Sequence, residues 1–371
     1  MKHGTVIGMA AAGWALCAAG FAMDRTQCFR SYLFAYVVFL QLALGCFALT
    51  MVHALTGGAW GESLRRPLAA GTGSLPWMAL LFLPIAAGAH EIYPWAAWAG
   101  AGGLQGEARH AAAYLNIPFF LIRAAGYFLI WSVWALRLKA RPGPALSASG
   151  LILYGLTAQF AAFDWCMSLE PGWHSTAYGF LFIASEAPPA LALLILCATA
   201  GDGKDAGPLL APSRLSDAGN LLLAFVLVWA YLFFMQFLII WSGNLPDEIA
   251  WYARRGAGGW RWLAVSLAFL QFAAPLSLLL SRSVKRSSRL LRPLAALVLG
   301  AHAAGVFWSL APAFGSAVFK IHGQDGACLL AVGATWYWIF ARGYAAGNPL
   351  RRPAPSDAET SVSTALGTGH G

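Results

Sequence analysis

Long apolar runs recur along the whole chain and are separated by short polar segments. A helix needs about 20 apolar residues to cross the hydrocarbon core of a bilayer, and most of these runs reach that length. The pattern predicts an all-α polytopic membrane protein with about ten transmembrane helices. The predicted spans are residues 4–22, 31–54, 75–92, 111–136, 148–165, 178–200, 219–242, 260–280, 289–311 and 327–344.

The two ends of the chain differ from this regular pattern. The first run has a basic start, an apolar centre and small residues at its end, which also describes a signal peptide; we favour a retained helix. Residues 347–371 have almost nothing to bury and are expected to be a disordered cytoplasmic tail. The remaining loops are short, so residues 1–346 form one transmembrane domain and any activity lies within or beside the bilayer.

Composition and charge agree with a membrane protein. Hydrophobic residues make up 59% of the chain, 17 residues are tryptophan, and the formal net charge is +9. Sixteen of the 24 Lys and Arg residues lie at the two ends or in the loops after even-numbered spans, and seven lie in the loops after odd-numbered spans. Cytoplasmic loops collect basic residues, so we expect both termini in the cytoplasm of a bacterial inner membrane. The positive charge therefore does not indicate a nucleic-acid partner.

The cysteines and histidines do not form recognisable cofactor motifs. The six cysteines include no C-x-x-C and no C-x-x-C-H, so the chain lacks the spacing for a zinc ribbon, an iron–sulfur cluster or covalent haem. His53 and His90 fall at opposite ends of their spans, and His302 has no histidine at its level. We therefore expect no metal or haem on this chain.

Three ionisable residues are predicted at membrane depth, where charges are costly and often functional. At 1.5 Å per residue, Arg123 lies roughly 18 Å, Glu186 about 12 Å and His302 about 14 Å from the outer ends of their spans. An Arg123–Glu186 pair would offset the burial of both charges, with His302 beside it as a proton carrier. The alternative is a buried ion pair with a purely structural role. Pro188 and Pro189 should bend the span after Glu186 and free backbone carbonyls there.

Two outer loops combine tryptophans with ionisable residues. FDWCMSLEPGWHS (163–175) and IIWSGNLPDEIAWYARRGAGGWRW (239–262) lie on the same predicted side. Tryptophan alone would indicate interfacial anchoring, but the added charges favour a surface for an outer-side partner. The residues predicted to dock a partner are Glu170, Trp173, His174, Asp247, Glu248 and Trp251.

Several distinctive stretches resemble one family. SYLFAYVVFLQLALGCFALTMVHALTGGAWGESLRR, LPWMALLFLPIAAGAHEIYPW, YLNIPFFLIRAAGYF, FDWCMSLEPGWHST and FLIIWSGNLPDEIAWYARR are similar to a membrane component of bacterial alternative complex III, the quinone-binding subunit 2 of quinol:cytochrome c oxidoreductase. The similarity covers roughly residues 30–285, and beyond about 290 only the hydropathy matches.

The resemblance implies more than the composition does. It implies two four-helix bundles with added peripheral helices, as in the membrane anchors of polysulfide and nitrite reductases. It implies a homologous membrane subunit, an iron–sulfur subunit, c-type cytochromes and a terminal oxidase as partners, with haem c and iron–sulfur clusters on those partners. Quinol or menaquinol contact and proton transfer are the expected contributions of this chain. The implied proton-relay residues are Glu91, Arg123, Asp164, Glu186 and His302, the last outside the well-matched region.

Two other functions remain open from the residues alone. A secondary transporter would use Arg123 and Glu186 at the membrane midplane, and such proteins often have related halves with matching helix breaks. Pro84, Pro118, Pro188 and Pro275 do not fall in matching positions. A membrane anchor of a polysulfide-type reductase would differ mainly in its outer partners.

Overall fold

The computed structural model describes residues 3–98, 106–140, 142–199, 211–315 and 318–346, and every regular element in these ranges is helical. Nine of the described helical segments are long and apolar enough to cross a membrane. They are α1 (His3–Met23), α2 (Arg25–Thr56), α4 to α6 (Arg65–Ala87), α9 (Ile117–Ala140), α10 (Pro144–Trp165), α11 with α12 (Tyr178–Thr199), α13 (Pro212–Gly243), α15 to α16 (Gly258–Leu280) and α18 (Ser288–Leu310). The protein is therefore an all-α polytopic membrane protein, as predicted.

A tenth long helix, α19 (Gly323–Ala345), coincides with the last predicted span, residues 327–344. It is long enough to cross a membrane but is not among the nine most apolar described segments. It packs along α1 and α2, and Trp14 of α1 donates a hydrogen bond to Thr335 of α19 at 3.0 Å. The α1 helix is therefore part of the packed structure.

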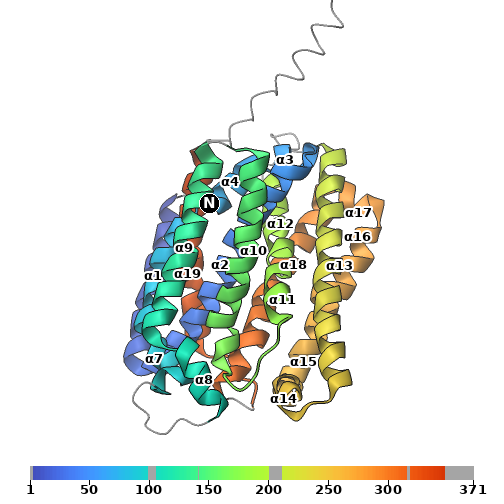
Figure 1. Cartoon of the computed structure of the whole chain (residues 1–371). Helices are drawn as coiled ribbons and strands as arrows, with labels where there is room; N and C mark the ends of the chain where they lie inside the picture. The colour runs from blue at the N-terminus through green and yellow to red at the C-terminus, as the bar shows by residue number, and fades with distance from the viewer. Residues whose placement is uncertain (1–2, 99–105, 141, 200–210, 316–317, 347–371) are drawn as a thin grey trace, which may run out of the picture.

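Figure 1 shows the long helices packed side by side. Their contacts divide eight of the long helical segments into two groups of four. The first bundle contains α2, α4 to α6, α9 and α10, and the second contains α11 with α12, α13, α15 to α16 and α18. Contacts of α2 with α12 and α18 join the two bundles, while α1 and α19 lie outside the first. Within the most apolar 18-residue stretch of each helix, 89% of the α2 residues are buried but only 17% of the α13 residues. The helix α2 is the centre of the molecule, and α13 forms an outer wall.

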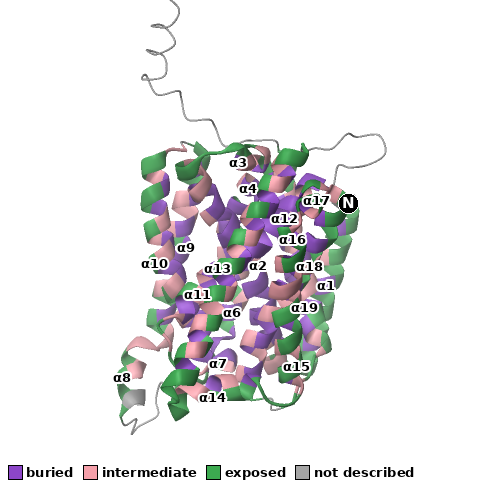
Figure 2. Cartoon of the chain, turned by 90° about the vertical axis from the view of Figure 1, so that its right-hand side faces the viewer, coloured by how far each residue is buried: buried purple, intermediate pink, exposed green. Residues whose placement is uncertain are grey.

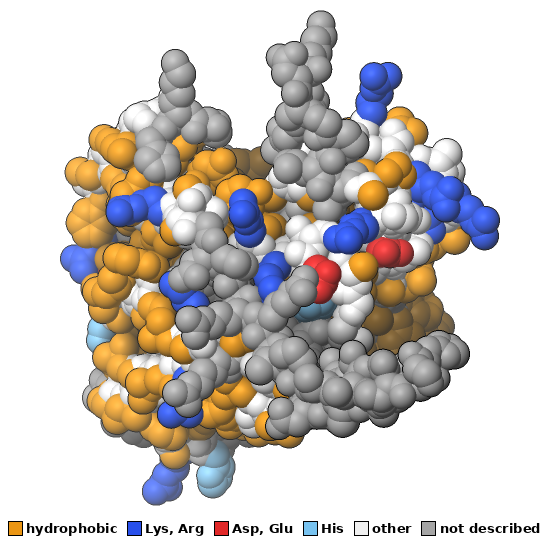
Figure 3. Space-filling model, turned by 90° about the horizontal axis from the view of Figure 1, so that it is seen from above, with side chains coloured by type: hydrophobic (Ala, Val, Ile, Leu, Met, Phe, Trp, Pro, Cys, Tyr) orange, Lys and Arg blue, Asp and Glu red, His pale blue; other side chains and the backbone are white. Residues whose placement is uncertain are grey.

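The two ends of the bundle differ in their loops and charge. At one end lie α3 (Ala59–Ser63) and α17 (Arg282–Arg286), and Arg and Lys side chains gather there (Figure 3). We call this end the basic face. The opposite face carries α7 (Ala89–Ile92), η1 (Pro94–Trp98), α8 (Glu107–Tyr114), η2 (Met167–Leu169), α14 (Pro246–Arg255) and η4 (Ala311–Phe314). The described ends of α1 and α19, near residues 3 and 345, both lie at the basic face because the long helices alternate in direction.

Exposed positions follow the outer helices along their length (Figure 2). Ile122, Leu129, Ile152, Phe234 and Ile239 are each more than half exposed, although each lies within a span. Apolar surface of this kind needs lipid or a partner helix to cover it. The belt therefore supports the assignment of these helices to a bilayer.

The fourth span begins later than its hydropathy predicts. The chain forms α8, then breaks at Leu115 and Asn116 before α9 begins at Ile117. The side chain of Asn116 accepts a hydrogen bond from the Phe119 amide at 3.0 Å, which caps the first turn of α9. Arg123 therefore lies about 9 Å, not 18 Å, from the start of its membrane helix. The predicted disordered tail, residues 347–371, lies outside the described residues.

Candidate functional site

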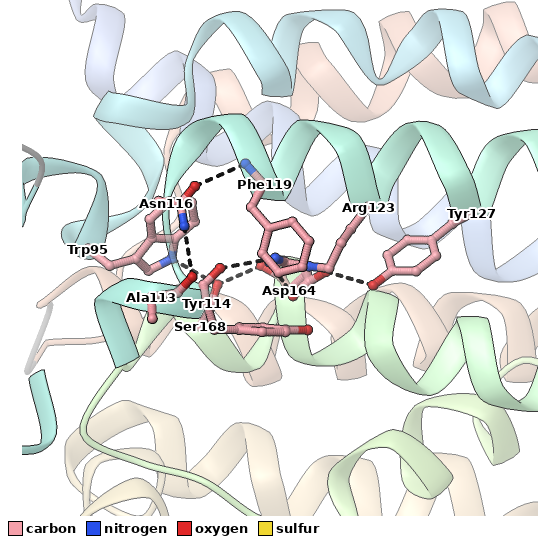
Figure 4. Close-up of polar contacts among 9 residues, drawn as sticks. All are labelled: Trp95, Ala113, Tyr114, Asn116, Phe119, Arg123, Tyr127, Asp164 and Ser168. Atoms are coloured by element: carbon pink, nitrogen blue, oxygen red, sulfur yellow. Dashed lines mark hydrogen bonds and ion pairs between the residues drawn. The ribbon is translucent and has the colours of Figure 1, made fainter. Parts of the chain in front are cut away.

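Arg123 forms a buried ion pair with Asp164, at the end of α10 (Figure 4). Its Nε and Nη2 atoms donate to the two carboxylate oxygens at 2.8 and 2.9 Å. The Asp164 side chain is fully buried, and the Arg123 side chain is 10% exposed. The structure therefore contradicts the predicted Arg123–Glu186 pair. That prediction depended on a depth for Arg123 that the late start of α9 makes too large.

Neighbouring side chains complete this ion pair. The Tyr127 hydroxyl donates to the same carboxylate at 2.8 Å, and the Arg123 guanidinium lies over the Tyr114 ring with its Cζ 3.8 Å from the centroid. Arg123 also donates to the Tyr114 carbonyl at 3.0 Å (Figure 4). Bidentate Arg–carboxylate pairs with satisfied oxygens are strong and well ordered. The arrangement is typical of a structural ion pair that fixes α9 against α10 and the start of the 163–175 loop.

Glu186 lies at a break between α11 and α12. Helix α11 ends at Ala184 and α12 begins at Ala187, and Pro188 and Pro189 cannot donate to the carbonyls one turn earlier. The helix is therefore broken at the place where the prolines predicted a bend. The Glu186 side chain is buried and accepts a short hydrogen bond from the Tyr154 hydroxyl of α10. Its second oxygen, Oε1, has no hydrogen-bond partner among the described residues.

A serine and a glutamine lie between this helix break and a cavity in the second bundle. Ser185, next to Glu186, accepts a hydrogen bond from the Gln41 amide of α2 at 2.9 Å. Both side chains line a large cavity in the second bundle. The Oε1 atom of Gln41 is buried and without a hydrogen-bond partner in the described structure. The buried acid and the cavity are therefore neighbours through Ser185.

The cavity has a volume of about 740 Å³ and lies between α11, α13, α15, α18 and the centre of α2. Its walls are mainly aromatic: the rings of Trp229, Phe233, Trp308 and Trp251 follow one another in this order with centroids 5.4 to 5.9 Å apart. Its rim includes Leu227, Tyr231 and Phe234, exposed on α13 within its span. We name it the lateral cavity, because these rim residues place its opening on the side of the molecule. Its size is typical of sites for small molecules.

Few polar groups face the lateral cavity, and three of them have an atom without a hydrogen-bond partner among the described residues: the amide oxygens of Gln41 and Gln271 and the hydroxyl of Tyr252. The Oε1 atom of Gln271, like that of Gln41, is buried with no hydrogen-bond partner in the described part of the chain. Gln271 lies in η3 (Ala268–Ala273), a π-helical turn, and such turns occur frequently at functional sites. Gly305 of α18 faces it, where a Cβ atom would come within 3.0 Å of the Gln271 oxygen. Two carbonyl acceptors thus remain free in an apolar surrounding.

His302 lies at the inner wall of the lateral cavity. Its Nε2 atom is 3.4 Å from the Val38 carbonyl of α2, and its side chain is 2% exposed. It contacts neither Arg123 nor Glu186 through any hydrogen bond or ion pair in the described chain. His302 is therefore the predicted relay residue that lines the lateral cavity.

The end of the cavity toward the opposite face is lined by Arg255 of α14. Its Nη2 atom donates to the Glu170 carboxylate at 2.7 Å and to the Ser309 carbonyl at 2.7 Å. Its Cζ lies 3.7 Å from the Trp251 ring centroid. Burial lowers the pKa of Arg255 below its ordinary value, and the neighbouring Glu170 carboxylate opposes this shift only in part. A paired cation therefore closes this end of the cavity.

Part of the predicted docking surface is instead internal. Glu170 pairs with Arg254 and Arg255, and Trp173 stacks on Trp251 with centroids 5.0 Å apart. Trp173 and Trp251 are at most 5% exposed, so these two rings and Glu170 serve the fold of the chain and not a partner surface. The prediction was wrong for them because the two loops pack against each other. His174 and Asp247 are exposed and Glu248 is partly exposed, and their docking role remains a prediction.

Glu91, the remaining predicted relay residue, lies at the opposite face near the start of α2. It accepts a hydrogen bond from Thr26 at 2.7 Å and lies 3.6 Å from the Arg25 guanidinium. Its side chain is one-third exposed. No described contact connects it with Asp164 or Glu186, so the structure does not bring the five relay residues together.

The cavity and site residues that the sequence analysis did not identify are neutral. Gln41, Gln271 and Tyr154 carry no charge, and the search for ionisable residues did not include them. An isolated glutamine within an apolar run, as in VFLQLAL and AFLQFAA, is a signal that could have found the first two. Among the described residues, no group of three or more His, Cys, Asp or Glu is arranged to hold a metal ion.

No protein-family model matches the chain, and no curated protein matches it.

Proposed function

We propose that the chain is a membrane subunit of a quinol-oxidising respiratory complex of the alternative complex III type, and that the lateral cavity receives the quinol ring. The resemblance over residues 30–285 favours this class of complex. The two four-helix bundles with α1 and α19 outside them agree with the architecture that the resemblance implies. The chain contributes a membrane-embedded binding site and supports assembly; it is not a catalyst on its own.

The observation that carries the proposal is the pair of free acceptors in the lateral cavity. A quinol presents two hydroxyl donors on an apolar ring, and its isoprenoid tail remains in the bilayer. The aromatic walls suit the ring, and the unpartnered oxygens of Gln41 and Gln271 suit the hydroxyl groups. A buried acceptor without a donor costs about 1–3 kcal/mol, which a hydroxyl ligand would recover. The opening on the lipid side suits a ligand that diffuses in the membrane.

Oxidation of a quinol releases two protons and two electrons. In this proposal the two electrons pass to the iron–sulfur cluster and haem c of the partner subunits, and the two protons leave the cavity one at a time toward Glu186, whose free oxygen can accept one. Tyr154 holds the other oxygen of Glu186. Asp164 lies ten residues from Tyr154 on α10, about 15 Å along the helix axis, and Arg123 occupies both of its oxygens. We therefore assign Arg123 and Asp164 to the structure and keep Glu186 as the proton-carrying candidate.

The remaining parts of the proposal follow from charge and resemblance. The basic face is assigned to the cytoplasm of a bacterial inner membrane, which places both termini there. The opposite face, with His174, Asp247 and Glu248, would then meet the iron–sulfur and c-type cytochrome partners, which carry the haem and the clusters. The homologous membrane subunit and a terminal oxidase complete the proposed set of partners.

A secondary transporter gains less support. Its halves should show helix breaks at corresponding places. The third and sixth spans are broken, at Gly73–Ser74 and at Ser185–Glu186, but α13, the seventh, is continuous over 32 residues. If the two bundles are repeats, the third span corresponds to the seventh. The third span is broken and the seventh is not, so the helix breaks do not match. A polysulfide-type reductase anchor shares the fold and would be separated by its partners.

The first test is steady-state quinol oxidation by the purified complex. Gln41→Leu and Gln271→Leu remove the free acceptors at nearly constant volume, and each should raise the KM for a short-chain menaquinol about tenfold, the equivalent of about one hydrogen bond. Electron transfer from an artificial donor to the cytochrome subunits should not change.

Gln159→Leu is the matched control, because Gln159 lies on α10 and does not line the lateral cavity. Its KM should equal that of the unmodified complex. A KM that stays unchanged in both cavity variants would contradict the proposed site. Isolation of the chain without haem-containing partners would contradict the proposed complex.

A further inference from the structure

A second hollow, of about 340 Å³, lies at the opposite face, away from the lateral cavity. Arg30 and Phe34 of α2, Trp260 of α15, Phe307 of α18, and Lys320 and Asp325 near the start of α19 contribute to its lining. We name it the basic hollow, after Arg30 and Lys320; it lies at the other end of the molecule from the basic face. It lies where α2 begins, α18 ends and α19 begins, at the level where apolar helices give way to polar loops.

Two cations reach the basic hollow without an acidic partner. Neither Arg30 nor Lys320 forms an ion pair with any described residue, and the Arg30 Nε atom is buried with no hydrogen-bond partner there. The Arg30 guanidinium lies over the Phe314 ring, with its Cζ 5.0 Å from the centroid. A buried guanidinium nitrogen without an acceptor is costly, so the site is incomplete without an anion.

The one carboxylate in the hollow is already engaged. Asp325 accepts hydrogen bonds from the Ser31 hydroxyl at 2.5 Å and from the His322 amide at 2.8 Å, as part of the cap of α19. His322 lies 3.8 Å from the same carboxylate. Asp325 therefore serves the end of α19, and the charge of Arg30 and Lys320 is left for a ligand.

The walls of the hollow indicate which anion fits. Phe34, Trp260 and Phe307 form an apolar side, while the cations form a polar side. A phospholipid has this combination, because its phosphodiester lies at the membrane interface above ester-linked acyl chains. An inorganic anion would use the cations and leave the aromatic side without a role.

We propose that the basic hollow binds the phosphodiester headgroup of a phospholipid of the adjacent leaflet. Arg30 donates to the phosphate through its guanidinium, Lys320 supplies a second charge from the loop before α19, and the aromatic side holds the glycerol end of the acyl chains. The bound lipid would join α2, α18 and α19 at this face. The proposal does not depend on quinol binding in the lateral cavity.

Native mass spectrometry of the detergent-purified protein, with whatever subunits it retains, tests this proposal. After delipidation, phosphatidylglycerol is titrated and the tightly retained lipid per chain is measured. Arg30→Gln and Lys320→Gln should each weaken its retention about tenfold, the equivalent of losing one charge-assisted hydrogen bond. Arg30→Lys, which keeps the charge, should retain more than Arg30→Gln.

Arg261→Gln is the matched control, because Arg261 is exposed at the same face, on α15, and does not line the hollow. Diacylglycerol, which lacks the phosphate, should not be retained, and inorganic phosphate should not displace phosphatidylglycerol. Retention at the unmodified level in both Gln variants would overturn the proposal. Displacement by inorganic phosphate at comparable affinity would also overturn it in favour of a free-anion site. If Arg30→Gln does not fold, the exposed Lys320→Gln decides alone.

Discussion

At the scale of single residues, charge and polarity have separate roles in this protein. The charged residues predicted from the sequence mostly support the fold: Arg123 with Asp164, and Glu170 with Arg255. Free polar atoms occur mainly on residues that carry no charge, such as Gln41 and Gln271, and also on Glu186 and, at the edge of the membrane, on Arg30. A charged side chain in a membrane must be paired within the fold, whereas a neutral amide can remain open to a ligand at lower cost.

The Arg123–Asp164 pair makes a direct prediction about stability. Arg123→Leu and Asp164→Leu should each lower the free energy of unfolding by about 3–5 kcal/mol, because each leaves one buried charge without its partner. The double variant should lose much less than the sum. Unfolding in mixed detergent micelles measures all three values. Small and additive losses would show that the pair is not coupled.

The sequence predicted Arg123 and Asp164 as important but not as partners. The pairing depends on where α9 begins, and Asn116 sets that position by capping the helix six residues after the predicted start of the span. Hydropathy does not reveal this, because the residues of α8 before the break include enough alanines to continue the apolar run.

At the scale of helices, the number and order of the spans could be predicted, and their packing could not. Each predicted span overlaps a long helical segment of the structure. The internal breaks were predicted only where prolines follow, as at Pro188 and Pro189. The π-helical turn at Ala268–Ala273 left no sequence signal for its shape, because all its residues except Gln271 are apolar and the turn follows from packing.

The contact between α2 and α12 provides a test at this scale. Gly45 of α2 lies so close to the chain at Glu186 that a Cβ atom would be 2.3 Å from the Glu186 carbonyl oxygen. Gly45→Ala should therefore separate the helices and destabilise the protein by about 1–3 kcal/mol. Gly155→Ala on α10, where no atom lies within 4 Å of an added Cβ, should be neutral or slightly stabilising. Equal effects of the two substitutions would contradict this close approach.

At the scale of the whole molecule, the two bundles define the lateral cavity and the charge defines a proposed orientation. The lateral cavity lies mostly in the second bundle, and Gln41 reaches it from α2, which joins the bundles. No sequence pattern locates such a cavity, because its lining comes from helices far apart in the chain. The charge asymmetry, in contrast, could be read from the loops alone.

The orientation can be measured in intact cells with a membrane-impermeant maleimide. With Cys197, the one native cysteine that is not fully buried, replaced by serine, His174→Cys should react from outside. Arg286→Cys at the basic face should react only after the membrane is permeabilised. The parent without an added cysteine gives the background. The reverse pattern would invert the assignment of both faces.

The central claim is that the lateral cavity binds a quinol, and photolabelling of the purified protein with an azido-quinone tests it most directly. Peptide mapping should place the label on residues that line the cavity, within α13 or α18, and excess menaquinone or the Gln271→Leu substitution should reduce it. Label confined to lipid-facing residues outside the cavity, or unaffected by that substitution, would contradict the account.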